Sequence, residues 1–222
     1  APSQEGKICV MSCPDHIQTK LNVSRETLTR LETLADLLVK WNPRINLVSK
    51  STIDDLWTRH ILDSVQVLRS GPSKAAHWVD IGSGGGFPGL VIALMAAEPE
   101  APKKVTLIES DQRKCAFLRT VLRETGVSGT VTTDRIEKAA PQNADVLSAR
   151  ALADLSLLCE FAERHLTASG TAVFPKGARW QKELKSAQES WLFDCEVVKS
   201  ITDPEAVILK IGELKRVGSH TP

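Results

Sequence analysis

Hydrophobic residues in the first part of the chain recur at the spacing of a helix. Between Ser24 and Trp41 they stand three or four positions apart, at Leu28, Leu31, Ala35, Leu38 and Trp41. This period is typical of an amphipathic helix that packs one face against another element. Ser24 is a suitable N-cap, and Asn42-Pro43 predicts the end of the helix because a residue before proline avoids the helical conformation.

A second apolar face follows between Ser51 and about Leu68. Its members are Ile53, Leu56, Trp57, Ile61, Val65 and Leu68. Ser51 with Asp54 is a start signal for a helix, and Gly71-Pro72 is a stop signal. The sequence therefore predicts two amphipathic helices before residue 77, each of which needs a partner surface.

From residue 77 the pattern changes to short apolar runs that alternate with helical segments. Strands are predicted at 77–81, 105–109, 129–132, 145–148 and 171–175, and helices at 88–97, 112–124, 154–166 and 179–191. This alternation predicts a parallel, doubly wound α/β sheet. Two more strands, at 196–201 and 206–211, are joined by too few residues for a crossover, so they must pair antiparallel. The result is the outline of a methyltransferase sheet.

The composition is that of an ordinary globular protein. The chain has 222 residues, of which 42% are hydrophobic and 25% charged, and its formal net charge is +1. No polybasic tail indicates a densely negative partner. No apolar run approaches the ~18 residues that a membrane-spanning helix needs, so we expect no membrane contact.

The cysteines are scattered and odd in number: Cys9, Cys13, Cys115, Cys159 and Cys195. This pattern differs from that of small secreted disulfide frameworks and indicates a reducing compartment. Cys9 and Cys13 alone are a weak metal signal, so we expect no metal site. The first residues lack the basic and apolar segments of a signal peptide. We therefore expect a cytoplasmic protein.

The strongest local signal is the glycine-rich segment from Val79 to Gly89, which follows a predicted strand and opens a predicted helix. Its glycines permit a tight turn and the close approach of a ligand to backbone N–H groups. Two spacings fit it. Gly84, Gly86 and Gly89 match the G-x-G-x-x-G pattern of dinucleotide enzymes. Asp80, Gly82, Gly84 and Gly86 match the D-x-G-x-G-x-G pattern of S-adenosylmethionine (SAM) enzymes.

Three features favour SAM over a dinucleotide. Asp80 places a carboxylate where it can meet the ammonium of a methionine moiety, directly or through water, whereas a pyrophosphate would gain nothing from this anion. Pro88 removes an N–H that would help to clamp phosphates. The chain contains no tyrosine, so the Tyr-Lys pair of many NAD(P) dehydrogenases is impossible. A glycine turn without a ligand is the remaining alternative.

Other polar residues follow the later strands. Glu109 closes the second strand, where a carboxylate can accept both ribose hydroxyls of an adenosyl group. Ile136 and Glu137 follow the third strand and are candidates for main-chain contacts with adenine. Arg150 follows the fourth strand at the point that faces the methyl group. It is either functional or an ion-pair partner of Asp80 or Glu109.

Two methyl-acceptor chemistries lack their motifs. The Asn/Asp-Pro-Pro-Tyr/Phe segment of exocyclic amine methyltransferases is replaced after the fourth strand by Ser148-Ala149-Arg150-Ala151. The nucleophilic cysteine of cytosine-C5 enzymes is missing there, and Cys159 lies among apolar neighbours on the next predicted helix. The remaining acceptors carry a lone pair or an easily lost proton.

Several stretches resemble the bacterial 16S ribosomal RNA (guanine-N7) methyltransferase G family, also called glucose-inhibited division protein B. They are Lys40-Trp41-Asn42 with Asn46-Leu47, Arg59-His60-Ile61-Leu62-Asp63-Ser64, the Asp80–Gly89 loop, Ser148-Arg150-Ala151 and Lys176-Gly177. The resemblance covers roughly residues 25–212. The Arg-His-Ile-Leu-Asp-Ser element and the Phe-Pro-Gly end of the loop are its most specific parts. One departure is Glu109-Ser110, where some relatives have Asp-Ser.

This resemblance implies a Rossmann-like class I SAM-dependent methyltransferase domain with an N-terminal helical extension. Residues 1–23 would be a mobile segment, 24–76 the extension, 77–212 the methyltransferase domain and 213–222 a C-terminal tail. SAM contacts carry over to Gly82, Phe87, Ile136, Glu137 and Arg150. The implied substrate is a guanine in the 530 loop of 16S rRNA, methylated at N7 in naked RNA or in 30S particles, with S-adenosyl-L-homocysteine as the other product. No general base is expected.

Candidate RNA contacts are basic residues: Arg59, His60, Lys176 and Arg179. The last predicted helix has an apolar stripe at Trp180, Leu184, Ala187 and Trp191, which leaves Lys182 and Lys185 beside it. A solvated charged face, or a packed His60, explains the same residues equally well.

Two other functions stay open: a SAM-dependent methyltransferase with a small-molecule or protein substrate, and a non-catalytic SAM- or RNA-binding module.

Overall fold

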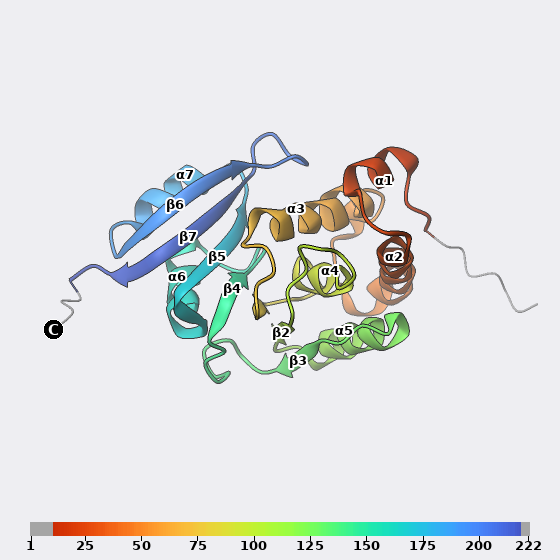
Figure 1. Cartoon of the computed structure of the whole chain (residues 1–222), viewed down its shortest axis with the longest axis horizontal. Helices are drawn as coiled ribbons and strands as arrows, with labels where there is room; N and C mark the ends of the chain where they lie inside the picture. Colours follow the sequence, from red (N-terminus) through yellow and green to blue (C-terminus); the bar gives the residue numbers. More distant parts are fainter. Residues whose placement is uncertain (1–10, 219–222) are drawn as a thin grey trace, which may run out of the picture.

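A seven-stranded sheet runs through the protein in the order β3-β2-β1-β4-β5-β7-β6 (Figure 1). The computed structural model describes residues 11–218. The strands are β1 (Trp78–Ile81), β2 (Val105–Glu109), β3 (Thr130–Thr133), β4 (Ala144–Ser148), β5 (Leu166–Lys176), β6 (Trp191–Lys199) and β7 (Val207–Arg216). Strands β3, β2, β1, β4 and β5 pair in parallel, whereas β7 pairs antiparallel with β5 and β6. The predicted doubly wound sheet with an antiparallel hairpin is confirmed.

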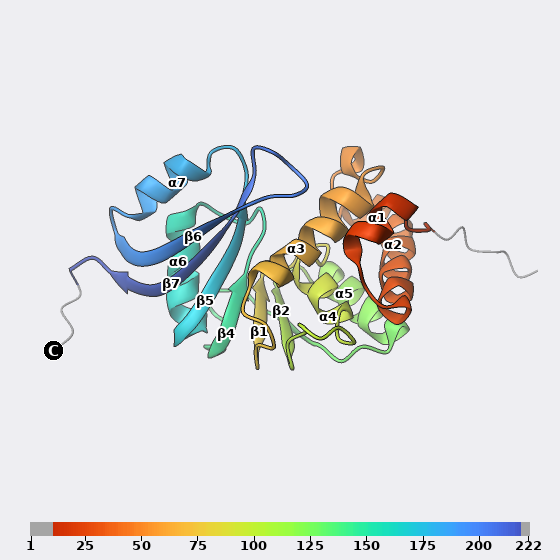
Figure 2. The same cartoon turned by 45° about the horizontal axis from the view of Figure 1, so that its top comes forward.

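Helices cover both faces of this sheet (Figure 2). They are α1 (Asp15–Leu21), α2 (Arg25–Ile45), α3 (Asp63–Ser70), α4 (Gly89–Leu94), α5 (Gln112–Thr125), α6 (Leu155–His165) and α7 (Trp180–Ala187). Two short non-α segments precede α3, namely the 3₁₀ turn η1 (Lys50–Thr52) and the π-helix η2 (Leu56–Leu62). Strand order reverses between β1 and β4, and ligands of open α/β sheets bind at such a reversal.

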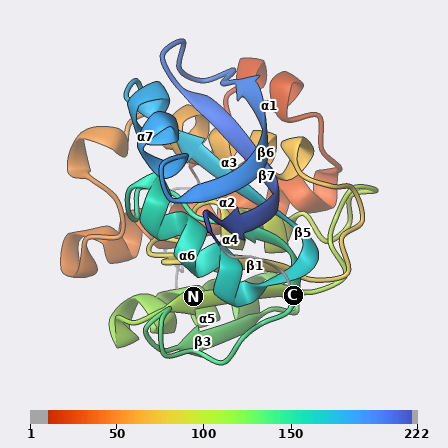
Figure 3. The same cartoon turned by 90° about the vertical axis from the view of Figure 1, so that its left-hand side faces the viewer.

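Two hydrophobic cores lie on opposite faces of the sheet. One joins the strands to α3, α4 and α5 and continues outward to α2, where Leu31 and Leu38 are fully buried. Trp41 of α2 meets the Phe117 ring of α5 edge-on, with centroids 5.7 Å apart. The other core packs α6 and α7 against the strands, and Figure 3 shows these two helices on the side of the β6–β7 hairpin. The helical extension therefore belongs to the same packed body as the sheet.

The predicted end of the first helix at Asn42-Pro43 is wrong. Helix α2 continues through Pro43 to Ile45 and is capped by Asn46 at φ 49°. Pro43 lies in the last turn, where its missing N–H costs a single hydrogen bond. The buried Asn42 side chain compensates, because it bonds both the N–H and the C=O of Val48 at 2.9 and 3.1 Å.

The second predicted helix is interrupted. The chain forms η1, then the wider π-helix η2, and becomes α-helical only at Asp63. The predicted apolar face is nonetheless buried at Leu56, Trp57, Ile61, Val65 and Leu68. Hydrophobic periodicity located the buried side correctly but could not reveal the extra residue per turn. π-helical turns occur frequently at functional sites.

Several predicted boundaries also move. Part of the segment expected to be mobile folds into α1, whose Ile17 and Leu21 are buried, while Cys9 lies outside the described residues. Strand β7 extends to Arg216, into the predicted C-terminal tail. Helix α7 ends at Ala187, and Trp191 opens β6 instead of completing a helical stripe.

Residues 11–218 hold neither a membrane-spanning helix nor a cluster of metal-ligating side chains. None of the helices in this range is long and apolar enough to cross a membrane. The same range contains no group of three or more His, Cys, Asp or Glu side chains arranged to hold a metal ion. Cys13, Cys115, Cys159 and Cys195 are free thiols.

Candidate functional site

The carboxyl ends of β1 and β2, with the loops after β3 and β4, line a cavity of about 460 Å³. We call it the glycine-loop cavity. Most of the predicted cofactor residues line it: Gly82, Gly84, Phe87, Glu109, Ile136, Glu137 and Arg150. Asp80 and Gly86 were also predicted to bind the cofactor, but they lie beneath this surface. Residues from four separate strand ends are thus brought together at the point where the strand order reverses.

Glu109 is held in a fixed orientation at the end of β2. Its Oε2 accepts a hydrogen bond from the Gly84 N–H, and its Oε1 accepts one from the Asp111 N–H, both at 2.8 Å. The residue is 8% exposed. Each carboxylate oxygen keeps a lone pair after these bonds. Glu109 therefore fixes the glycine loop and can still accept hydrogen bonds from a ligand in the cavity.

Asp80 is fully buried under the loop. Its Oδ1 accepts a hydrogen bond of 2.6 Å from the Ser148 hydroxyl, which itself accepts one from the Trp78 indole. Its Oδ2 has no hydrogen-bond partner. Burial raises the pKa of this carboxyl to about 6, against the opposing effect of the Ser148 hydrogen bond. The carboxylate lies below the cavity wall, and its predicted contact with an ammonium group, directly or through water, stays a prediction.

The two most informative glycines have different roles. Gly82 lines the cavity at φ +63°, and a Cβ there would come within 2.7 Å of the Leu152 side chain. Gly86, at φ +94°, faces away from the cavity, where a Cβ would come within 2.6 Å of Leu90. Gly82 therefore keeps the cavity open, whereas Gly86 allows the loop to pack on α4.

The loop after β3 carries Ile136 and Glu137 on the opposite side of the cavity. The backbone carbonyl of Ile136 accepts a hydrogen bond of 2.9 Å from Nε2 of His165, the last residue of α6. His165 is fully buried, and this burial lowers its pKa. Sequence reasoning missed this buried support of the loop, for which the sequence carries no signal.

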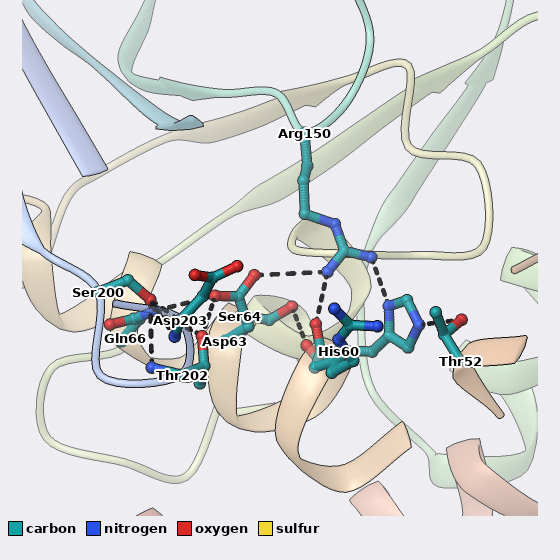
Figure 4. Close-up of polar contacts among 10 residues, drawn as sticks. Thr52, His60, Asp63, Ser64, Gln66, Arg150, Ser200, Thr202 and Asp203 are labelled. Carbon is teal, nitrogen blue, oxygen red and sulfur yellow. Dashed lines mark hydrogen bonds and ion pairs between the residues drawn. The ribbon is translucent and has the colours of Figure 1, made fainter. Parts of the chain in front are cut away.

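Arg150 reaches toward the helical extension, as Figure 4 shows. Its guanidinium group donates to Nδ1 of His60 at 2.7 Å and to the Arg59 carbonyl at 3.1 Å, and it pairs with Asp63 Oδ2 at 3.4 Å. It also lies over the Phe87 ring, 5.2 Å from the centroid. The alternative reading of Arg150, an ion pair with Asp80 or Glu109, does not form, because the extension supplies Asp63 in their place.

His60 is nearly buried between Arg150 and Thr52. Because arginine can only donate, Nδ1 of His60 accepts and Nε2 carries the proton toward the Thr52 hydroxyl. Burial and the charges of Arg150 and Arg59 lower the pKa of His60 to about 4. The ring is therefore neutral at pH 7, which does not suit the predicted phosphate contact.

A second cavity, of about 320 Å³, lies between η2, α3, the end of β5 and the β6–β7 loop. We call it the hairpin cavity. Its lining includes Arg59, Asp63, Gln66, Pro175, Lys176 and Thr202. Arg150 and Ala151 line both cavities and form the wall between them. The sequence pointed to Asp63 only through the Arg-His-Ile-Leu-Asp-Ser element, and it gave no signal for Gln66 or Thr202.

The four predicted RNA contacts divide into two groups. Arg59 and Arg179 are both exposed. Arg59 lines the hairpin cavity, and Arg179 lines a neighbouring hollow beside α7. His60 is buried, as described above. The Lys176 side chain is 8% exposed and donates to the Ala153 carbonyl and Glu183, at 2.8 and 2.7 Å. Lys176 therefore joins the loop after β4 to α7 and is a poor candidate for a phosphate contact.

Solved structures show the same architecture. The ribosomal protein L11 methylase of Lactobacillus delbrueckii subsp. bulgaricus matches 68% of this chain and 76% of its own, with a TM-score of 0.54 and 15% identity. TYW2 of M. jannaschii, solved in complex with AdoMet, matches 78% and 80%, with a TM-score of 0.54 and 15% identity. At such low identity these likenesses show the fold alone, which is that of a Rossmann-like methyltransferase.

The relatives in sequence are much closer. The family described as rRNA small subunit methyltransferase G matches residues 27–210. A ribosomal RNA small subunit methyltransferase G from Ruegeria sp. (strain TM1040) is 59% identical over 198 residues, 89% of this chain and 96% of the relative. One from Ruegeria pomeroyi is 56% identical over 207 residues, 93% of this chain and 100% of the relative. With a match over most of its length, the chain belongs to the rRNA small subunit methyltransferase G family.

Proposed function

We propose that this protein transfers the methyl group of SAM to N7 of a guanine in the 530 loop of 16S rRNA. Membership of the family supports this reaction. The structural observation that carries it is the wall shared by the glycine-loop and hairpin cavities at Arg150 and Ala151. A donor in one cavity and a base in the other would meet at this wall. The substrate is 16S rRNA, alone or within 30S particles, in the bacterial cytoplasm.

The residues of the glycine-loop cavity fit SAM. Gly82 leaves space where a side chain would collide with Leu152, and the oriented Glu109 carboxylate suits ribose hydroxyls. The unpartnered Oδ2 of Asp80, buried beneath the loop, suits a nearby ammonium group. When bound, SAM supplies an electrophilic methyl group on a sulfonium centre.

Arg150 and its partners prepare the wall between the cavities. Contacts with His60, the Arg59 carbonyl and the Phe87 ring hold the guanidinium group in one place. Holding two reactants in a productive geometry can lower a barrier by several kcal/mol, on the order of 7–11 in the best cases. We assign Arg150 this positioning task.

The reaction requires no proton abstraction, because guanine N7 carries a free lone pair at neutral pH. His60 would be a poor base, since both of its ring nitrogens are engaged. We therefore expect the single-turnover rate at saturating SAM and substrate to change little between about pH 6.5 and 8.5. A rise of about tenfold per pH unit, lost on substitution of Asp63, His60 or Glu137, would instead establish a catalytic base.

The decisive experiment uses labelled SAM and 30S subunits from a strain that lacks this enzyme. We expect the label at N7 of one guanine in the 530 loop, and none in subunits from the parent strain, which already carry the methyl group. Label in a protein or a small molecule would contradict the proposed substrate. SAM binding by calorimetry without transfer to any fraction would indicate a non-catalytic module.

A further inference from the structure

The hairpin cavity has the form of a base-binding site. Its inner surface includes Pro175, Val207 and Ile208, of which the last two are buried strand residues. Its other side carries polar groups from η2, α3 and the β6–β7 loop. A planar base needs this combination of an apolar face and a polar edge, and enzymes that modify a base must take it out of its stack into such a cavity.

Asp63 is a carboxylate of this cavity that pairs with Arg150 of the shared wall. Its Oδ1 accepts two hydrogen bonds of 2.9 Å, from Gln66 and Thr202 (Figure 4). Its Oδ2 has only the longer contact of 3.4 Å with Arg150, and the side chain is 17% exposed. The carboxylate is therefore fixed through one oxygen, while the other keeps acceptor capacity beside the wall.

The supports of Asp63 come from distant parts of the chain. Gln66 accepts a hydrogen bond from the Ile201 N–H and donates to the Ser200 hydroxyl, both at 3.0 Å. The β6–β7 loop thus holds the side chain of Gln66, which holds Asp63. A charge held in this way needs no rearrangement when a ligand changes its own charge, which is the condition for electrostatic catalysis.

The charges around the wall of Arg150 and Ala151 indicate an electrostatic role for the Asp63 carboxylate. Methylation at N7 moves one positive charge from the sulfonium to the purine, and the two groups must touch each other beside the wall for the transfer to occur. Arg150 already places a positive charge in that wall, which would oppose a cationic purine beside it. Lys176 is paired with Glu183, and Asp203 lies exposed at the mouth of the cavity. Asp63 is the anion held against Arg150.

We infer that the hairpin cavity binds the target purine and that Asp63 stabilises the positive charge that develops on its ring during methyl transfer. This inference rests on the proposed function. In the transfer, the N7 lone pair forms the new N–CH₃ bond, and the S–CH₃ bond breaks with its electron pair staying on sulfur. The purine becomes cationic and the sulfonium becomes a neutral thioether. Asp63 takes no proton and acts through its charge.

The test compares two probes, GMP and 7-methyl-GMP, which differ in the positive charge of the methylated ring. Binding is measured by calorimetry with S-adenosyl-L-homocysteine at saturation, so that neither probe can enter the glycine-loop cavity. We expect the wild-type protein to bind 7-methyl-GMP at least about tenfold more tightly than GMP, and D63N to lose most of this preference. Asparagine keeps an oxygen for Gln66 and Thr202, but it removes the negative charge and places an N–H donor where Oδ2 faces Arg150.

D203N is the matched control, because it removes the same charge from the mouth of the same cavity. It should keep most of the preference. Equal losses in both variants, an unchanged preference in D63N, or no binding of either probe at millimolar concentration would each overturn the inference. Melting temperature and calorimetric affinity for SAM verify that D63N is folded. If D63N has a lower melting temperature than the wild type, Q66M provides a second test. It removes the hydrogen bond that Gln66 donates to Asp63 but keeps the carboxylate, so it should also weaken the preference for 7-methyl-GMP.

A kinetic measurement separates this inference from the proposed function. With 30S subunits, we expect D63N to lower the single-turnover rate at least about tenfold while SAM affinity stays unchanged. A rate equal to that of the wild type would overturn the role of Asp63. If the wild-type protein does not methylate 30S subunits but shows the Asp63-dependent preference for 7-methyl-GMP, the proposed rRNA substrate is wrong and the cationic-purine site stands.

Discussion

The two cavities that meet at Arg150 are built in different ways. The lining of the glycine-loop cavity comes mainly from strand ends and the loops that directly follow them, such as Gly82 after β1 and Glu109 at the end of β2. Asp63, Arg150 and Thr202, which surround the hairpin cavity, are brought together from distant segments by side-chain contacts. Backbone geometry shapes the first cavity, whereas a side-chain network shapes the second.

This difference predicts different responses to mutation. A change in the glycine loop alters backbone conformation and should remove cofactor binding. A change in the network of Arg150 and Asp63 leaves the loop in place and should alter methyl transfer more than SAM affinity. Substitutions in the two cavities and on the surface, with their matched controls, test this division.

The largest effect is expected for Gly82→Val. Gly82 has φ +63°, and a Cβ there would come within 2.7 Å of Leu152. A β-branched residue is strongly disfavoured at positive φ, and its side chain would also enter the cavity. Calorimetry should show SAM affinity reduced by about 100-fold or more, a loss of roughly 3 kcal/mol.

Gly126→Val is the matched control for this loss. Gly126 caps α5 at φ +65°, and a Cβ added there meets nothing within 4 Å. It should lower the melting temperature through backbone strain alone and leave SAM affinity unchanged. Equal SAM affinities in the two variants would show that Gly82 does not shape the binding surface.

The second-largest effect, a loss of turnover, is expected for Arg150→Lys, which keeps the positive charge but loses the planar guanidinium group. A lysine would have to replace contacts with His60, the Arg59 carbonyl and the Phe87 ring, and its single ammonium group cannot make all of them. We expect turnover on 30S subunits to fall by about tenfold or more, equivalent to at least about 1.4 kcal/mol, with a smaller change in SAM affinity.

Arg164→Lys loses a comparable guanidinium group at a position that lines neither cavity. Arg164 donates twice to the Ala139 carbonyl, at 3.2 and 2.8 Å. Both lysine variants should melt earlier than the wild type, but only Arg150→Lys should lose turnover per folded molecule. Full turnover in Arg150→Lys, with a lowered melting temperature, would make Arg150 a purely structural residue.

The same division explains what could be predicted from the sequence. The sheet, its antiparallel hairpin and most of the glycine-loop cavity follow from local patterns, because strand ends and their following loops lie together in any doubly wound sheet. Asp80 was placed on the correct strand end, but its depth depends on Ser148 and on how closely the loop packs above it.

The hairpin cavity could not be predicted because its contacts join residues far apart in the sequence. The bond between Thr202 and Asp63 spans 139 positions, and Arg150 lies 87 positions from Asp63. The π-helix that precedes Asp63 was equally hidden, since its apolar residues fit an α-helical period well enough. Basic residue types alone also failed to separate the buried Lys176 from the exposed Arg179.

A third prediction concerns the pH dependence of SAM binding through Asp80. Burial raises the pKa of this carboxyl from 3.8 to about 6, so below pH 6 it is largely protonated in the folded protein. A nearby ammonium group favours the ionised form, so binding should release a proton. Calorimetric SAM affinity should rise with pH, by at most about tenfold per unit, and level off above about pH 6.

Stability without SAM should show the opposite trend. The folded state binds the Asp80 proton more tightly than the unfolded state does, so stability falls as pH rises from 3.8 to about 6 and is flat above it. The change is on the order of 3 kcal/mol at most. Asp80→Asn should remove this part of both profiles. If the variant and the wild type have the same pH dependence of SAM affinity, the charge of Asp80 does not contribute to SAM binding.

The smallest effect is expected at the surface, for Arg179→Ala. Arg179 is exposed beside α7 and shares a hollow with Lys182, next to the loop after β4. A phosphate contact there would contribute on the order of one unit to the slope of log affinity against log salt concentration. We expect 30S affinity to fall a few-fold at low salt, with a slope smaller by roughly one unit and an unchanged affinity for SAM.

The matched control is Arg123→Ala, at the end of α5, whose side chain is 70% exposed and paired with Glu124. Equal salt slopes for both variants would mean that the RNA does not pass over α7. Its path to the hairpin cavity would then have to run along the side of Arg59, which the corresponding Arg59→Ala slope would reveal.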